Sequence, residues 1–195
     1  MKNKTPLCKI AYKYGTDKCP AIGHPYTPFY YELLKDKKDS IKKVIEIGIG
    51  IKTYVYNNPK PYTTGASLYM WRDFFPNAVI FGADILPESM FKANRIKTFI
   101  CDETKKEDLE NLIAKTGSDI DLFIDDGLHS KNAQIFLAKT ILPMLFKNVI
   151  YVIEDAGFPR TIKNVLSDYI CREPKLDFQG QPRYPKQRLV IVKNK

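Results

Sequence analysis

The sequence predicts an α/β fold: a mainly parallel, Rossmann-like sheet with helices on both faces and an antiparallel pair of strands at its C-terminal edge. From Lys42 onward, short apolar, β-branched runs alternate with amphipathic stretches. This alternation is typical of right-handed βαβ units around a parallel sheet. The last two β-like segments follow each other without a helix between them, so we expect them to pair antiparallel.

The expected elements follow in a regular order. Glycine, proline and aspartate separate them, as is usual for turns between strands and helices. Gly117 is a plausible cap for one helix, and Pro76 stops another. We expect strands at 43–50, 78–85, 96–102, 119–126 and 148–155, the edge pair at 175–180 and 187–194, helices at 66–75, 105–117, 132–146 and 160–170, and a polar loop at 51–65.

The chain has 195 residues and reads as one domain. Residues 1–38 are rich in tyrosine and proline and predict an irregular segment with a short helix around 27–34. Residues 39–195 carry the sheet. We therefore expect an N-terminal segment that packs on, and partly covers, a Rossmann-like domain.

Composition narrows the function. No apolar run reaches the roughly 18 residues of a membrane span, and the basic start lacks a secretory signal. The four cysteines are far apart with no metal-binding spacing, so we expect a reducing, cytoplasmic location. A net charge of +9 favours acidic partners such as nucleotides, nucleotide-linked sugars or nucleic acid, although scattered lysines equally fit a solvated surface.

Polar residues at the ends of the first three strands suggest a nucleoside pocket. Gly48 and Gly50 close the first strand, Asp84 ends the second and Asp102 ends the third. Glycines allow close approach of a ligand, and Asp84 could accept hydrogen bonds from ribose hydroxyls while Asp102 reaches the adenine. A plain tight turn, a turn aspartate and a turn cap remain the alternatives at these positions.

The acidic Glu46 in the first strand would repel a pyrophosphate but tolerate a sulfonium or an amino group. The phosphate-binding glycine motifs of dinucleotide and P-loop proteins are also missing from the sequence. These features favour S-adenosylmethionine over NAD as the cofactor. We add Ser67 and Asp125, which adjoin these motifs, to the candidate cofactor contacts.

A second polar group follows the fourth and fifth strands. Asp126 ends one and Glu154-Asp155 ends the other, and neighbouring strands lie only about 4.8 Å apart. Carboxylates that converge so closely favour a bound cation, and oxygen ligands suit Mg²⁺. His129 is near enough to face the same cavity. The alternative is a strand-to-helix turn in which Gly127 permits the bend, with ordinary turn residues around it.

Six motifs together resemble a known family: "KYGTDK", "HPYTPFYYELL", "EIGIG", "GASLYMWRDFFPNAVIFGADI", "DLFIDDGLHS" and "VIYVIED". In this order they are similar to the S-adenosylmethionine-dependent macrolide-sugar O-methyltransferases of the mycinamicin and tylosin type. The resemblance runs from about Tyr12 to Asp155. It implies a class I methyltransferase sheet, Mg²⁺ bound by Asp126, Glu154 and Asp155, and His129 as the catalytic base.

The resemblance further implies that the segment from Tyr14 to Lys18 folds over the cofactor, which makes Thr16 and Lys18 candidate cofactor contacts. Leu128 departs from the small polar residue usual in the family. An unperturbed histidine pKa near 6.5 would suit His129 as a base at neutral pH.

The expected activity is therefore Mg²⁺-dependent methyl transfer to a hydroxyl of a small-molecule sugar or nucleotide-linked sugar, by a chain that could form a homo-oligomer. A nucleic-acid methyltransferase and a non-catalytic adenosine-binding protein are the alternatives. The first lacks a basic stripe with interleaved aromatic residues. The second is open because a fold does not imply a function.

Overall fold

The computed structural model describes residues 5–50, 63–178 and 187–195. An eight-stranded sheet has the order β3-β4-β2-β1-β5-β6-β8-β7. Its parallel strands are β1 (Lys43–Ile47), β2 (Val79–Asp84), β4 (Ile96–Ile100), β5 (Leu122–Asp125) and β6 (Ile150–Ile153). The antiparallel strands are β3 (Lys92–Ala93), β7 (Ile170–Arg172) and β8 (Val190–Lys193). The predicted fold class is confirmed.

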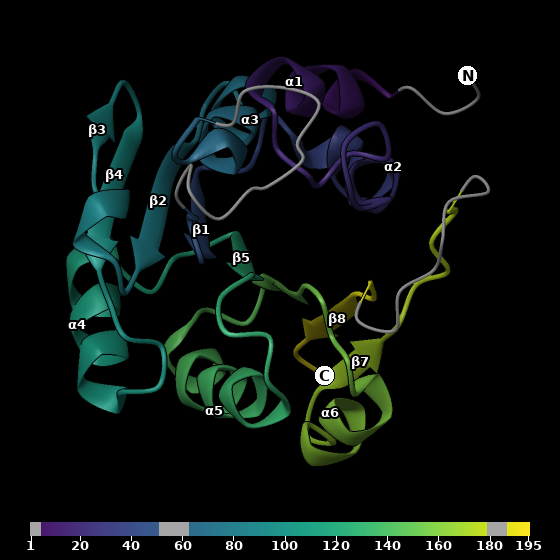
Figure 1. Ribbon diagram of the computed structural model, residues 1–195. Coiled ribbons are helices and arrows are strands. Elements are labelled where there is room, and N and C mark those ends of the chain that lie inside the picture. Colours follow the sequence, from purple (N-terminus) through teal and green to yellow (C-terminus); the bar gives the residue numbers. More distant parts are fainter. Residues whose placement is uncertain (1–4, 51–62, 179–186) are drawn as a thin grey trace.

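Helices cover both faces of the sheet (Figure 1). On one face lie α1 (Pro6–Tyr14), α2 (Tyr26–Leu34) and α3 (Ala66–Phe74), and on the other lie α4 (Lys106–Thr116), α5 (Lys131–Ile141) and α6 (Pro159–Val165). Short 3₁₀ turns occur at Lys35–Lys37, Pro87–Ser89 and Leu142–Met144. Because alternate strand residues face opposite sides, each face has its own apolar cluster.

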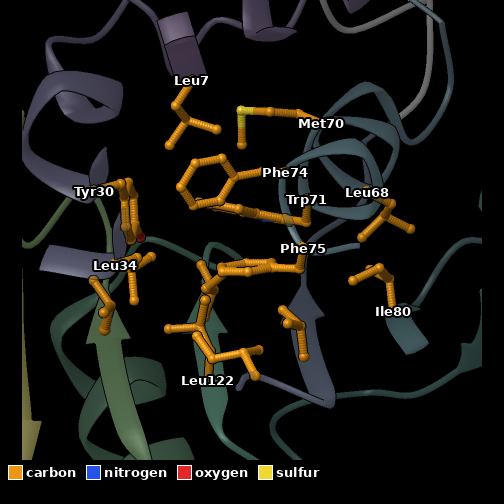
Figure 2. Close-up of a cluster of buried hydrophobic side chains, with 14 of the residues drawn as sticks. Leu7, Tyr30, Leu34, Leu68, Met70, Trp71, Phe74, Phe75, Ile80 and Leu122 are labelled. Atoms are coloured by element: carbon orange, nitrogen blue, oxygen red, sulfur yellow. The ribbon is translucent and has the colours of Figure 1, made fainter. Parts of the chain in front are cut away.

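The cluster on the α1–α3 face joins the N-terminal segment to the sheet. Trp71 of α3 is fully buried and meets the ring of Tyr30 edge-on, with ring centroids 5.0 Å apart. Leu7, Tyr30, Trp71 and Leu122 lie in one layer between helices and strands (Figure 2). Residues 5–38 are therefore part of the same core as the sheet.

Three local predictions are wrong. The irregular N-terminal stretch contains α1, whose N-cap Thr5 accepts a hydrogen bond from the N–H of Cys8 and whose C-cap Gly15 has a left-handed φ of 78°. Such caps and a proline at the first position are helix signals that the tyrosine- and lysine-rich composition obscured.

The predicted helix at 160–170 ends at Val165, and residues 170–172 instead form β7, which pairs with β8. Residues 175–178, which were expected to begin a strand, belong to no strand. Pairing with the sheet edge thus overrode a helical pattern. The rest of that expected strand and most of the expected loop at 51–65 lie outside the described residues.

The order of the strands places a crevice at a defined point. The chain runs outward from β1 through β2 to β4, and then returns to the other side of β1 at β5. Ligands bind beyond the carboxyl ends of the strands at such a switch point. No described helix is long and apolar enough to cross a membrane.

Candidate functional site

A cavity of about 860 Å³ opens at the carboxyl ends of the parallel strands. The N-terminal segment supplies part of its wall. The lining residues that the sequence had singled out are Thr16, Lys18, Gly48, Gly50, Ser67, Asp84, Asp102, Asp126, His129, Glu154 and Asp155. The structure therefore gathers most of the predicted site residues around one cavity, although residues far apart in sequence supply them.

The floor of the cavity is built by the glycines after β1. Gly48 has a left-handed φ of 90°, and a side chain there would place its Cβ only 2.0 Å from the carbonyl oxygen of Asp126. Gly48 is thus needed because the neighbouring β5 turn passes so close. Asp84 holds the same loop, since its Oδ2 accepts hydrogen bonds from the N–H groups of Ile49 (2.9 Å) and Gly50 (3.2 Å).

Two residues that were predicted to contact the cofactor, Asp102 and Glu46, are hydrogen-bonded to other groups of the protein. Asp102 Oδ1 accepts hydrogen bonds from the N–H (3.0 Å) and hydroxyl (2.6 Å) of Thr104. These bonds fit the turn-cap alternative, and the side chain still borders the cavity. Glu46 lies behind the wall, fully buried, and its carboxylate accepts hydrogen bonds from Ser67 (2.5 Å) and the indole N–H of Trp71.

Like Glu46, Asp125 is a predicted cofactor contact that does not line the cavity. Its side chain is fully buried and is not among the residues that line the cavity. Burial raises the pKa of this carboxyl well above its usual range, and the charge of Glu103 adds to the effect. Side chains alternate along a strand, so Asp125 and Asp126 point to different sides.

A buried lysine lies at the centre of the acidic group. Lys18 is 1% exposed, and its Nζ donates to Asp126 Oδ2 at 2.5 Å and to Glu154 Oε2 at 2.8 Å. The carboxylate of Glu46 is 3.7 Å away. The sequence presented Lys18 as a cofactor contact, whereas the structure makes it the counter-ion of the carboxylates that end β5 and β6.

Two tyrosines of α2 complete this network. Tyr30 donates to Glu154 Oε1 at 2.6 Å, and Tyr26 donates to Asp155 Oδ1 at 2.7 Å. Both are fully buried. Sequence reasoning missed them, although their spacing of four residues in "HPYTPFYYELL" puts them on one helix face.

Asp155 adopts a backbone conformation that is uncommon for a non-glycine residue. Its φ is 46°, and such strain often occurs at functional sites. In this position its Oδ2 lies 3.7 Å from His129 Nδ1 and its Oδ1 lies 3.7 Å from His24 Nδ1. His129 Nε2 lies 3.1 Å from Asp126 Oδ1. His24 is a further residue that the sequence did not single out as part of the site.

These groups offer a metal site. Among the described residues, Asp126, His129 and Asp155 present ligand atoms that all lie within 4.8 Å of one another. Glu154, the third ligand expected from the sequence, has one oxygen hydrogen-bonded to Lys18 and the other to Tyr30. The donor set suits a divalent cation, and Glu154 is not part of the group of converging ligand atoms.

Carboxylates outnumber cationic groups in this cluster. Four carboxylates, those of Glu46, Asp126, Glu154 and Asp155, lie around the ammonium of Lys18 and the imidazole of His129. Burial alone would lower the pKa of Lys18, but the charges of Asp126 and Glu154 outweigh it, so the pKa is raised well above its usual value. Burial raises the pKa of Glu154 to about 8 despite Lys18. The surplus of carboxylates thus favours a bound cation.

The pKa of His129 differs from the ordinary value near 6.5 that the sequence suggested. Burial lowers its pKa, but the hydrogen bond and charge of Asp126 dominate and raise it to about 9. In this arrangement the imidazole is therefore protonated at neutral pH and cannot accept a proton. A cation beside Asp126 and Asp155 would oppose this effect, since neighbouring positive charge lowers a histidine pKa.

The chain is similar in sequence to several known sugar O-methyltransferases. It is 35% identical over 156 residues to mycinamicin VI 2''-O-methyltransferase of Micromonospora griseorubida. It is 32% identical over 149 residues to 8-demethyl-8-alpha-L-rhamnosyl tetracenomycin-C 2'-O-methyltransferase of Streptomyces olivaceus, and 32% identical over 152 residues to demethylmacrocin O-methyltransferase of Streptomyces fradiae. The chain is a relative of these sugar O-methyltransferases. The resemblance found in the sequence is confirmed.

The alignments cover 76–78% of this chain but only 36–37% of these three sugar O-methyltransferases, so the chain spans little more than a third of their length. Among solved structures, the MycE methyltransferase of the mycinamycin pathway, in complex with Mg and S-adenosylhomocysteine, has a TM-score of 0.72 and 24% identity. The structural match covers 98% of this chain and 55% of the MycE chain. The Podospora anserina methyltransferase PaMTH1, bound to S-adenosylhomocysteine, has a TM-score of 0.59 and 12% identity, with 98% and 88% covered. These likenesses establish the fold. No family model matches the chain.

Proposed function

We propose that this protein is an S-adenosylmethionine-dependent O-methyltransferase that acts on a hydroxyl of a sugar, either nucleotide-linked or attached to a larger small molecule. The observation that carries the proposal is the cavity that joins Asp84 and the glycine loop on one side to Asp126, His129 and Asp155 on the other. One cavity can therefore hold a nucleoside and a reacting hydroxyl next to each other. The sequence relatives, which are named as sugar O-methyltransferases, support this reaction class.

We assign the cofactor to the side of the cavity formed by the ends of β1, β2 and β4. Asp84 fixes the backbone of Ile49 and Gly50 and borders the cavity. It remains our candidate for the ribose hydroxyls. The buried acidic residues nearby favour a cationic sulfonium over a phosphate group. Thr16 and Lys18 support the expectation that the N-terminal segment covers the cofactor, because both line this cavity from that segment.

We assign the acceptor to the side of His129. A divalent cation such as Mg²⁺ suits the ligand atoms of Asp126 and Asp155. Asp126 also contacts Lys18 and His129, and Asp155 accepts a hydrogen bond from Tyr26. Glu154 stays our third candidate ligand. Such a cation supplies Lewis-acid chemistry that makes a nearby hydroxyl easier to deprotonate.

The residues of the chain have distinct parts in this proposal. Asp126 orients the imidazole of His129 through Nε2, and His129 accepts the proton of the acceptor hydroxyl when added positive charge has lowered its pKa. Lys18 and Tyr30 fix Glu154, and Tyr26 fixes Asp155. Much of the acceleration in such a reaction comes from holding the hydroxyl in line with the methyl group.

The test combines binding with turnover. We expect calorimetry to show binding of S-adenosylhomocysteine, and methyl transfer from S-adenosylmethionine to a panel of glycosides and nucleotide-linked sugars to stop when EDTA is added. Asp126→Asn should keep the fold and the binding of S-adenosylhomocysteine but lose metal-dependent turnover, because a neutral amide is a weaker ligand. Asp121→Asn, outside the cavity, is the matched control. Absence of S-adenosylhomocysteine binding would overturn the proposal.

A further inference from the structure

The turn between β5 and α5 carries two groups of the proposed reaction, Asp126 and His129. One side of the turn is fixed by β1, since the N–H of Asp126 donates to the carbonyl of Ile47 at 2.9 Å. Its far end is fixed by Ser130, whose hydroxyl accepts from the N–H of Ala133 at 3.2 Å and caps α5. Between these anchors the N–H of Ser130 donates to the carbonyl of Leu128 at 2.6 Å, and the N–H of Leu128 donates to an acceptor outside the turn.

Glu103 provides that acceptor. It follows β4 and is 7% exposed, and its Oε1 accepts a hydrogen bond from the N–H of Leu128 at 2.7 Å. Its Oε2 occupies the space beside Gly127, where an added Cβ would come within 1.6 Å of it. The φ of Gly127 is not in the left-handed region, so what the glycine contributes here is the space that the Glu103 carboxylate occupies. The chain bends at Gly127, as the alternative turn reading expected, and the space beside the glycine is filled by Glu103.

The neighbouring Asp102 does not share this part. Its carboxylate bonds to Thr104 in its own turn. Burial raises the pKa of Glu103, while the hydrogen bond from Leu128 opposes the shift. A buried carboxylate is costly unless it makes hydrogen bonds, and a bond to a backbone N–H is stronger when the acceptor is charged. Burial of the Glu103 carboxylate is thus unfavourable by itself, and the hydrogen bond from Leu128 offsets part of that free energy.

We propose that Glu103 is a positioning residue, whose carboxylate locks the turn through Leu128 and Gly127 so that Asp126 and His129 face the acceptor side of the cavity. The position of Glu103 against the turn follows from contacts in this chain, and its effect on catalysis rests on the proposed function. Glu103 acts through the turn, and it supplies no ligand to the group formed by Asp126, His129 and Asp155.

The first experiment uses the two histidines of the chain as probes. NMR signals of the imidazole rings are recorded for the full chain at fixed pH, and a His24→Gln variant assigns them. In Glu103→Ala we expect the His129 signals to shift and broaden while the His24 signals stay in place. Glu103→Gln keeps an oxygen that can accept from Leu128, so the His129 signals should stay sharp and shift only by the effect of the lost Glu103 charge. Glu107→Ala, on the exposed face of α4, is the control.

The second experiment tests the contact between Glu103 and Gly127 by a double-mutant cycle. Gly127→Ala should displace the Glu103 carboxylate and reproduce the effect of Glu103→Ala on His129. In the double variant the methyl group finds vacated space, so the two effects should be strongly non-additive. Unmoved His129 signals in a folded Glu103→Ala protein, or additive effects in the cycle, would overturn the proposal.

Titration with Mn²⁺ separates this inference from the proposed function. We expect Glu103→Ala to weaken Mn²⁺ binding by about tenfold or more and Glu103→Gln to bind within about threefold of wild type, which corresponds to roughly 1.4 and 0.7 kcal/mol. If the wild type binds Mn²⁺ and Glu103→Ala binds it with the same affinity, the result counts against the positioning role of Glu103 and not against the metal site. If the wild-type chain binds no Mn²⁺, the metal part of the proposed function fails, and the NMR and cycle results still decide whether Glu103 holds the turn.

Discussion

Replacing Lys18 by methionine removes the counter-ion of the acidic cluster with little change in volume. The ammonium is 2.5 Å from Asp126 and 2.8 Å from Glu154, and the side chain is 2% exposed. Its loss leaves the buried carboxylate of Glu154 and the half-buried carboxylate of Asp126 without their charged partner. Removing one member of a buried ion pair costs about 3–5 kcal/mol, mostly because the remaining charge is left unpaired.

This cost can be followed by thermal unfolding. For a chain of this size, 1 kcal/mol shifts Tm by about 2–4 °C, so we expect Lys18→Met to lower Tm by roughly 6–20 °C. The loss should be larger at pH 8 than at pH 6. The pKa of Glu154 is already raised to about 8, and without Lys18 it rises further. A raised carboxyl pKa stabilises the folded state at low pH and loses that effect as pH increases.

Lys38→Met, at an exposed position after α2, is the matched control and should leave Tm within about 1 °C, as is usual for surface substitutions. Added Mg²⁺ should restore part of the Tm lost in Lys18→Met, because a divalent cation can replace the missing positive charge. Equal Tm values for wild type and Lys18→Met would refute the account of Lys18 as the counter-ion of this cluster.

The other predictions concern the cofactor, the base and pH. Asp84→Asn should weaken binding of S-adenosylhomocysteine by about 1.5–3 kcal/mol in calorimetry; unchanged affinity in a folded variant would remove Asp84 from the site. His129→Ala should lower kcat by about 10²–10⁴-fold with little change in affinity for S-adenosylhomocysteine, and added Mg²⁺ should not rescue it; near-normal turnover would exclude His129 as the base. Partial burial raises the pKa of Asp73, but hydrogen bonds from Tyr14 and Arg72 outweigh burial and lower it to about 2. Because this pKa is lowered on folding, Asp73→Asn should cost about 1–2 kcal/mol at neutral pH. Chemical unfolding at several pH values should show that difference fading between about pH 4 and pH 2, and a difference that persists at pH 2 would contradict it.

The strand-end residues show what the sequence can determine. The alternation of apolar runs and amphipathic stretches fixed the parallel sheet, and the rule that polar groups gather at carboxyl strand ends placed Asp84, Asp126 and Asp155 around one cavity. Both inferences depend on local pattern and on general rules of sheet topology. The resemblance to the sugar O-methyltransferases is likewise a property of the sequence alone.

Partners from distant parts of the chain were decided by the tertiary structure. Lys18 and Tyr30 meet Glu154 from 136 and 124 residues away, and no local pattern specifies such a contact. Side chains alternate along β5, and the pairing of β5 with β1 sets which of its residues face which side of the sheet. Only the structure shows that Asp125 does not line the cavity.

The charge states and the turns depend on the same packing. Burial lowers the pKa of His129, but the hydrogen bond and charge of Asp126 outweigh burial and raise it to about 9, whereas the sequence suggests an ordinary value. Gly127 has a place in the sequence that fits any turn, but the structure shows it facing the carboxylate of Glu103. The sequence thus determined which residue types reach the site, and packing between distant segments decided which of them pair, carry charge or hold others in position.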